Sequence, residues 1–318
     1  MKRGGRAVGN TDQSERPPLL NTKLIPPRLP PAWLPRPRLF DELQKGLARK
    51  LTVVSAGAGC GKSVLLASYV NSSGLPFVWY NLDSGDRDPM VFLSYLIKGI
   101  QGQFKGFSSK ALNLIKEGRE SGPSWERILA TLMNEVLDTL PKSLLIVLED
   151  YHLVEDTEGL RGVLNYLLRY LPPNLHLFLS SRRKPNLNLP KFRSQGEIME
   201  LKAGDLSFTR QEIRSLFSEI YRLPLSPQDL ERLGQHTEGW IMGLQLIAEV
   251  LRGKSPQEIS ASLVGFKGSR GYLFHYLNEE VFRGLPSATQ LFLKQSSIFR
   301  SFQCPTVRLH LGGDGRDP

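Results

Sequence analysis

A short glycine-rich loop constrains the fold of this chain more than any other feature. Residues 56–63 read Ala-Gly-Ala-Gly-Cys-Gly-Lys-Ser, between an apolar run at 51–55 and an apolar run at 64–70. The expected order is therefore strand, glycine loop and helix. Glycines let backbone N–H groups turn around a phosphate, and the N-terminus of the following helix adds positive potential at the same point. The pattern favours nucleotide phosphate binding over an ordinary glycine-rich turn.

The positions of this loop have separate predicted roles. Lys62 would reach the β- and γ-phosphates, and the Ser63 hydroxyl would ligate Mg²⁺. The strict pattern G-x-x-x-x-G-K-[ST] begins with glycine, whereas this chain has Ala56 at that position. The residues predicted to contact the nucleotide are Gly57, Ala58, Gly59, Cys60, Gly61, Lys62, Ser63 and Val64.

Length and composition limit the class of protein. The 318 residues suggest about two domains, and 40% hydrophobic with 23% charged residues describe a soluble globular protein. No run of 18 apolar residues offers a membrane span, and the basic N-terminus lacks the apolar core of a signal peptide. Two cysteines, Cys60 and Cys304, argue against a disulfide framework and fit a reducing compartment. We expect a cytoplasmic protein with no membrane partner.

The net charge of +10 is concentrated near the N-terminus. Residues 1–50 hold 11 basic and 4 acidic side chains, a difference of +7, which leaves +3 for the other 268 residues. The chain has no run of five basic residues, no zinc-ligand spacing and no alternation of aromatic and basic residues. We therefore interpret residues 1–21 as a disordered, solvated arm and expect no specific DNA binding.

A proline-rich segment leads into the first strand. Residues 22–38 contain six prolines, which predict an extended segment laid along a surface. Such a segment can cover the base of a nucleotide bound by the glycine loop, and a simple lead-in fits its spacing equally well. A helix is expected at 39–47, and a loose connection is expected at 105–123.

The remaining apolar runs predict a mostly parallel sheet and thus an α/β fold of the P-loop NTPase class. The expected strands after the first are 76–82, 143–148, 175–181 and 196–202. The run at 143–148 ends in Glu149 and Asp150, and the carboxyl ends of parallel strands open onto the ligand crevice. Glu149 is predicted to orient the water shell of Mg²⁺, and Asp150 to position or deprotonate the attacking water.

Basic and polar residues follow these strands. The run at 175–181 brings Arg182 and Arg183 to the same edge of the sheet, where Arg182 is predicted to contact the γ-phosphate through its two-pronged guanidinium. His152 could contact a phosphate or the attacking water, or it could cap a turn. Asp88 followed by Pro89 predicts the N-cap of a helix at 90–101, rather than a calcium site.

The character of the chain changes to all helix after residue 205. Thr209 and Glu212 form the pattern of a capping box at a helix start. Further helices are expected at 227–235, 239–252, 256–264, 270–283 and 287–298. The glycines and tryptophan at 237–245 suggest a helix that packs closely on another element.

In combination, these motifs resemble the nucleotide-binding module of MalT-like regulators, large ATP-binding proteins of LuxR type among the signal-transduction ATPases with numerous domains. The matching motifs are Thr22-Lys-Leu, Pro35-Arg-Pro-Arg38, the A-x-x-G-x-G-K-[ST] loop, Leu82-Asp83 with Gly85-Asp86 and Asp88-Pro89, Glu149-Asp-Tyr-His152, Ser181-Arg182, Leu206-x-Phe-Thr209, Thr237-Glu-Gly-Trp240 and Tyr276-Leu-x-x-Glu280-Val281. Their order is that of the family, over about residues 22–303.

The resemblance implies ATP and Mg²⁺ as ligands and a module organisation. It implies a P-loop domain at 22–205, then a helical domain and the start of a winged-helix region at 206–304. Effector-sensing repeats and a C-terminal DNA-binding helix-turn-helix would follow in the family, where ATP and an inducer together promote self-association. Gly59, Gly61, Lys62 and Ser63 match the family's phosphate and Mg²⁺ residues, and Arg182 its strand-end arginine.

Three departures from the family pattern qualify these expectations. The family usually has Asp where Glu149 stands, and the longer side chain is expected to weaken Mg²⁺ binding or hydrolysis. The sequence stops inside the expected winged-helix region, and residues 305–318 leave the family pattern, so we expect them to be a disordered or aberrant tail. The sequence therefore predicts an ATP-binding switch module with slow Mg²⁺-dependent hydrolysis. The alternative is a protein-interaction fragment that keeps the fold without catalysis.

Overall fold

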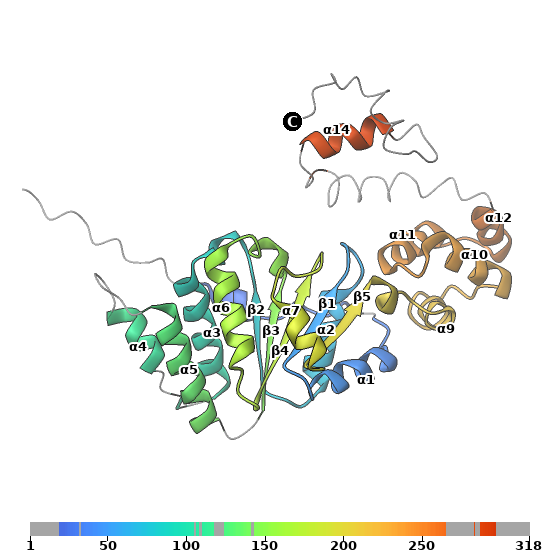
Figure 1. Cartoon of the computed structure of the whole chain (residues 1–318). Helices are drawn as coiled ribbons and strands as arrows, with labels where there is room; N and C mark the ends of the chain where they lie inside the picture. Colours follow the sequence, from blue (N-terminus) through green and yellow to red (C-terminus); the bar gives the residue numbers. More distant parts are fainter. Residues whose placement is uncertain are drawn as a thin grey trace, which may run out of the picture.

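The computed structural model describes residues 19–31, 33–104, 106–107, 110–117, 124–140, 143–264, 283 and 287–296. Within them, a five-stranded parallel sheet carries helices on both faces, and a group of helices follows along the chain (Figure 1). The predicted α/β class with a parallel sheet is therefore confirmed.

All five predicted strands are present. They are β1 (Leu51–Ser55), β2 (Phe77–Asn81), β3 (Leu144–Glu149), β4 (Leu175–Ser181) and β5 (Ile198–Lys202). Their order across the sheet is β2-β3-β4-β1-β5. Because β1 pairs with β4 and β4 with β3, the glycine loop after β1 and the residues after β3 and β4 meet at one edge of the sheet.

Alternate residues of each strand enter two different hydrophobic cores. On β1, Val53 packs into the core beneath helices α3 (Pro89–Gln103), α5 (Trp125–Thr139) and α6 (Glu158–Arg169). The next residue, Val54, enters the core beneath α1 (Pro37–Gly46) and α2 (Lys62–Ser72). Both faces of the sheet are thus covered, which explains why β3 is buried along its whole length.

Several local predictions are confirmed with shifted ends. The Asp88 side chain accepts a hydrogen bond from the Met90 N–H at 2.8 Å, and α3 begins at Pro89, as an N-cap followed by proline requires. Thr209 and Glu212 form the predicted capping box of α9 (Arg210–Ser215). Helix α1 begins at Pro37, two residues before the expected start, because proline is favourable at the first helical position.

Two parts of the chain hold more helix than the sequence suggested. Residues 110–117 were expected in a loose connection, but they form α4 (Lys110–Glu117), whose Ala111 is fully buried and whose Leu114 and Ile115 pack on the same core. A short helix, α7 (Leu189–Ser194), also precedes β5. Both were missed because a helix of six to eight residues shows barely two turns of its apolar spacing.

The proline-rich segment begins with a helical turn, η1 (Asn21–Leu24), where extended chain was expected. The turn precedes the prolines, so their restriction does not apply to it. Just before it, the Leu20 N–H donates to the Tyr95 hydroxyl at 2.9 Å. The end of the arm predicted to be disordered therefore has a fixed contact, while residues 1–18 lie outside the described residues.

Beyond the sheet the described residues form helices, as predicted. The helices are α8 (Ala203–Leu206), α9, the π-helical turn η4 (Leu216–Ile220), α10 (Pro227–Thr237), α11 (Ile241–Leu251), α12 (Pro256–Val264) and α14 (Ser287–Ser296). Helices α9 to α12 share a separate hydrophobic core that includes Phe217, Leu230 and Leu244. The expected helix at 270–283, the winged-helix start and the tail at 305–318 lie almost wholly outside the described residues.

The glycine and tryptophan motif near residue 240 does not form one helix. Glu238 and Gly239 have positive φ angles of 50° and 75°, which end α10, and Trp240 caps the start of α11. The predicted close packing is confirmed, because a Cβ on Gly239 would lie 2.5 Å from the carbonyl oxygen of Phe208. The backbone must turn here to let α11 begin beside that residue. No helix in the described ranges is long and apolar enough for a membrane span.

Candidate nucleotide-binding site

The glycine loop between β1 and α2 has the backbone geometry of a phosphate loop. Gly59 and Gly61 have φ angles of 67° and 79°, a left-handed conformation that side chains disfavour. Ala56 lies outside that region, and its N–H donates to the Ser181 carbonyl at 3.2 Å. The missing first glycine is therefore tolerated, because that position continues the strand ladder rather than turning.

Lys62 lies folded against the loop it belongs to. Its side chain is buried, and its Nζ donates to the carbonyl oxygens of Ala56 at 2.9 Å and Gly57 at 3.0 Å. Burial lowers the pKa of Lys62, while the carboxylates of Glu149 and Asp150 act in the opposite direction. The ammonium thus lies against its own loop and within the field of the two acids, and its predicted contact with the phosphates stays a prediction.

Ser63 and Glu149 are brought into direct contact by the fold. The Ser63 hydroxyl donates to Oε1 of Glu149, which is the last residue of β3. Glu149 is only 3% exposed, and its Oε2 has no hydrogen-bond partner among the described residues. Burial raises the pKa of Glu149 to about 6. A buried carboxylate with an unpartnered oxygen beside a serine hydroxyl fits a hard divalent cation such as Mg²⁺, which prefers oxygen ligands.

Asp150 and His152 lie next to this pair. Asp150 has a positive φ of 57°, its N–H donates to the Ser180 hydroxyl at 3.2 Å, and its side chain is 42% exposed. His152 is mostly buried, with its Nδ1 at 3.7 Å from Oδ1 of Asp150. Burial lowers the pKa of His152, which favours the neutral ring. The backbone turn at Asp150 thus holds one carboxylate at the open edge of the site, with an imidazole behind it.

The two arginines after β4 differ in their surroundings. Burial is the main cause that lowers the pKa values of Lys62 and His152. The positive charge of Arg182 also lowers both pKa values, so Arg182 lies near both residues. Arg183 instead forms ion pairs with the buried Glu155 and, at 3.4 Å, with Asp156. The nearness of Arg182 to Lys62 is consistent with its predicted role as phosphate sensor, which stays a prediction. Arg183 has structural partners in Glu155 and Asp156.

A cleft of about 350 Å³ extends from the loop toward the helical part of the chain. Its phosphate end is lined by Gly59, Cys60, Gly61, Lys62, Ser63 and Val64. Away from the loop the lining is mostly apolar, with Trp33 and Leu34 from the proline-rich segment and Phe208, Tyr221 and Met242 from the helical part, and it also includes Arg36 and Gln245. The proline-rich segment thus borders the cleft, and its base-covering role stays a prediction. Another hollow, of about 610 Å³, lies between α6 and α7 and contains none of the predicted site residues.

The helical part contacts the phosphate loop directly, which the sequence did not reveal. The Trp240 indole N–H donates to the Ala58 carbonyl at 3.2 Å, and the Met242 N–H donates to the Gly59 carbonyl at 3.3 Å. Trp240 and Ala58 are 182 positions apart in the sequence. The motif around Trp240 signalled close packing, but nothing in it indicated which element it would meet.

Comparisons with known proteins agree with the motifs. The chain is 32% identical over 268 residues to the HTH-type transcriptional regulator MalT of Serratia proteamaculans, and 31% identical to that of Cronobacter sakazakii. Each match covers 84% of this chain, which spans 29% of the length of these curated relatives.

Two further comparisons concern the fold. The family model described as nephrocystin 3, N-terminal, matches residues 32–182, which run from the cleft wall to the strand-end arginine. A Walker-type ATPase of Pyrococcus abyssi is similar in structure, with a TM-score of 0.54, 16% identity and coverage of 86% of this chain and 82% of that one. The chain therefore has the fold of a P-loop ATPase and is related in sequence to the MalT regulators, as its motifs predict.

Proposed function

We propose that this chain is an ATP-binding switch module of a MalT-type transcriptional regulator, with slow Mg²⁺-dependent hydrolysis. The observation that carries the proposal is the contact between the Ser63 hydroxyl and the buried Glu149 carboxylate, because Ser63 lines the cleft together with Lys62. The relatives are transcriptional regulators by name, and this chain matches less than a third of their length. We expect inducer binding and specific DNA recognition to involve other parts of such a protein.

Each residue of the site would have a separate role in binding the nucleotide. Lys62 would exchange its two carbonyl contacts for phosphate oxygens, and Ser63 and Glu149 would hold Mg²⁺. The bound metal ion would neutralise charge on the β- and γ-phosphates. Asp150 is half exposed at the strand end, where its carboxylate could orient a water. Arg182 would stabilise negative charge on the terminal phosphate.

A second candidate is nucleotide binding without turnover. The observation that favours it is that Oε1 of Glu149 already reaches the Ser63 hydroxyl. A shorter aspartate would leave more room between the hydroxyl and the carboxylate for a metal ion. In that case the module would change state by exchanging ATP for ADP, without hydrolysis.

The test of the proposed function is calorimetric titration of Mg·ATP into wild-type and Lys62→Ala protein. Lys62→Ala removes the ammonium but leaves both cores unchanged, so binding should weaken by about 100-fold while the thermal midpoint changes little. Lys45→Ala is the matched control, because Lys45 is an exposed lysine on α1 that pairs with Glu42. Equal ATP affinity in all three proteins would refute the proposed function.

A further inference from the structure

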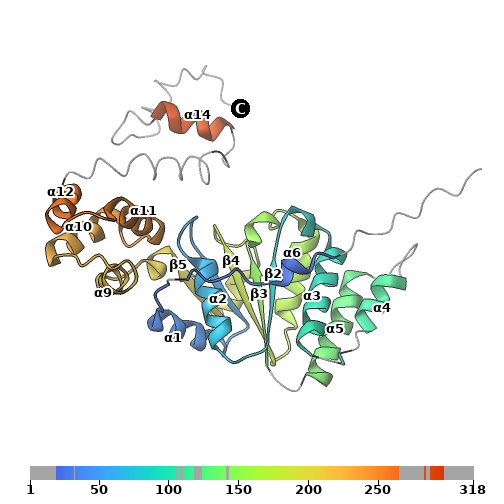
Figure 2. The same ribbon diagram turned by 180° about the vertical axis from the view of Figure 1, so that it is seen from behind.

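The N-terminal segment crosses the whole sheet before it enters α1. We call residues 19–31 and 33–38, which end with the first two residues of α1, the strap. It starts beside β2, at one edge of the sheet, and ends beside the residues that follow β5, at the opposite edge (Figure 2). Between these ends it contributes Pro30, Trp33 and Leu34 to the wall of the cleft. The position of this wall therefore depends on what holds the two ends of the strap.

The first anchor is a buried ion pair at β2. The Lys23 Nζ lies 2.6 Å from Oδ2 and 2.7 Å from Oδ1 of Asp86, and 2.9 Å from Oδ2 of Asp83. Asp86 is completely buried and also accepts a hydrogen bond from the Tyr80 hydroxyl at 2.7 Å. The Lys23 ammonium lies 5.0 Å from the centre of the Tyr95 ring. A buried carboxylate with these partners is costly to leave unpaired, so the anchor fixes the strap firmly.

Backbone contacts make the first anchor more specific. The Asn81 side-chain amide, at the end of β2, donates to the carbonyl oxygens of Lys23 at 3.2 Å and Ile25 at 2.9 Å. The strap therefore starts in a fixed register against the strand rather than through one side chain alone.

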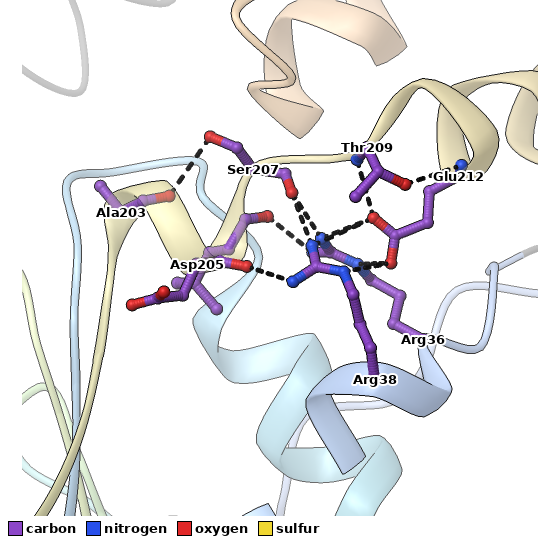
Figure 3. Close-up of polar contacts among 8 residues, drawn as sticks. Arg36, Arg38, Ala203, Asp205, Ser207, Thr209 and Glu212 are labelled. Atoms are coloured by element: carbon purple, nitrogen blue, oxygen red, sulfur yellow. Dashed lines mark hydrogen bonds and ion pairs between the residues drawn. The ribbon is translucent and has the colours of Figure 1, made fainter. Parts of the chain in front are cut away.

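The second anchor joins the strap to the start of the helical part. Arg36 and Arg38 both point at the carboxylate of Glu212, with four N–O distances between 3.0 and 3.1 Å (Figure 3). Their other N–H groups donate to backbone carbonyls, including that of Ser207, which accepts from both guanidinium groups. Glu212 also accepts from the Thr209 N–H at 2.8 Å as part of the capping box of α9.

The second anchor is linked to the cleft wall. Arg36 lines the cleft, and its guanidinium lies 4.1 Å from the centre of the Phe208 ring, which forms part of the same wall. Lys23, Asp86 and Glu212 are not among the residues that line the cleft. We therefore expect these three residues to influence a bound molecule mainly through the strap and Phe208.

We propose that Lys23 and Glu212 are positioning residues that hold the strap as the base-side wall of the nucleotide cleft. This inference rests on the proposed function. A strap fixed at both ends is already ordered before a ligand arrives, so binding does not have to supply the free energy of ordering it. The phosphate loop lies between β1 and α2, and the hydrogen bonds of Lys23 and Glu212 in the anchors go to other residues. Loss of an anchor should therefore weaken binding of a nucleoside triphosphate without weakening binding of a bare triphosphate.

The experiment titrates two ligands, Mg·ATP and Mg·tripolyphosphate, into Lys23→Met and Glu212→Gln proteins by calorimetry. The matched controls are Lys45→Met and Glu249→Gln, which remove a charge from the exposed pairs Lys45–Glu42 and Arg252–Glu249. ATP affinity should fall about tenfold in each anchor variant, the scale of one lost contact between a base and an aromatic wall. Tripolyphosphate affinity should stay within about twofold of wild type.

The outcomes separate the two proposals. If both ligands weaken equally in the anchor variants, or if neither weakens, the strap does not position the wall and this inference is wrong while the proposed function stands. If wild-type protein binds neither ligand, the proposed function fails and this inference fails with it. A general loss of folding would weaken both ligands together, so it cannot imitate the expected result.

Discussion

Glu149 is the site residue that differs from the family pattern, which usually has aspartate at this position. Its carboxylate is buried, contacts the Ser63 hydroxyl through one oxygen and leaves the other without a partner among the described residues. Burial raises its pKa to about 6, so near neutral pH the buried group is charged at a cost in stability. A bound cation would remove that cost, so metal binding depends on whether the Glu149 carboxylate is charged.

The first prediction at this scale concerns Glu149→Asp. Shortening the side chain by one methylene should open a gap between the carboxylate and Ser63 in which a metal ion fits, and Mg²⁺-dependent turnover should rise about two- to tenfold. ATP affinity should change little, because the phosphate loop is untouched. Steady-state phosphate release and calorimetry measure the two quantities. Turnover that falls or stays constant would mean that the site is built around glutamate.

A second prediction concerns the pH dependence of Glu212. Burial would raise its pKa, but the hydrogen bonds with Arg36 and Arg38 outweigh burial and lower it to about 2. The carboxylate is therefore stabilised in the folded chain above its ordinary pKa near 4.5, and that stability is lost as the pH falls toward 2. Glu212→Gln should cost roughly 2 kcal/mol at pH 7 and less at pH 3. Urea unfolding of both proteins at the two pH values measures the difference, and an equal cost at both would contradict the prediction.

At the scale of elements, the turn between α10 and α11 decides how the helical part meets the phosphate loop. Gly239 lies against the Phe208 backbone, whose N–H donates to the Gly239 carbonyl at 2.8 Å. This contact directs the start of α11 toward the loop, where Ile241 comes within 3.4 Å of the position that a Cβ on Gly61 would occupy. Two glycines with positive φ thus allow two backbones and a helix start to approach closely.

Gly239→Ala should therefore destabilise the chain more than an ordinary glycine substitution does. A Cβ would lie 2.5 Å and 2.7 Å from backbone atoms of Phe208, and backbone cannot move aside as a flexible side chain can. The matched control is Gly253→Ala, because Gly253 has a similar φ of 77° but no atom within 4 Å of its Cβ position. We expect a cost of about 1 kcal/mol for the control and about 2 kcal/mol more for Gly239→Ala. Equal urea midpoints for the two variants would show that the contact is not tight.

At the scale of the whole molecule, the net charge and the sequence similarity to MalT regulators give different expectations about DNA binding. The MalT relatives are named as HTH-type regulators, but this chain matches 29% of their length. Of its net charge of +10, +7 falls in residues 1–50. Several of those basic residues have partners within the fold, among them Lys23, Arg36 and Arg38. The charge that remains can attract phosphates, and contacts with phosphates alone carry no sequence information.

We therefore predict weak DNA binding by this chain, without sequence preference. Affinity should fall steeply as salt rises and should drop when residues 1–18 are deleted, because that removes basic residues and no described contact. A fluorescence titration of two duplexes of different sequence at physiological salt measures both. A preference of about 1000-fold or more for one duplex, the scale of specific recognition, would overturn the prediction.

The sequence by itself determined those features that depend on neighbours along the chain. Alternating and continuous apolar runs identified all five strands, and the spacing of Gly59, Gly61, Lys62 and Ser63 identified the phosphate loop. The helix N-caps at Asp88 and Thr209 could also be predicted from the sequence. In each case the partners lie within a few residues of each other, so side-chain type and spacing fix the local geometry. Short helices such as α4 and α7 were not predicted, because their apolar residues span too few helical turns to show a period.

The tertiary structure alone decided which distant residues meet. The strand order places Glu149 beside Ser63, which lies 86 positions earlier, and packing brings Lys23 to Asp86 over 63 positions and Trp240 to Ala58 over 182. Ser63 and Glu149 were expected at one Mg²⁺ site, but neither Lys23 nor Trp240 carries a sequence mark of its partner. Their pairing follows from burying both faces of one sheet at once, a condition that involves the whole chain and has no local period.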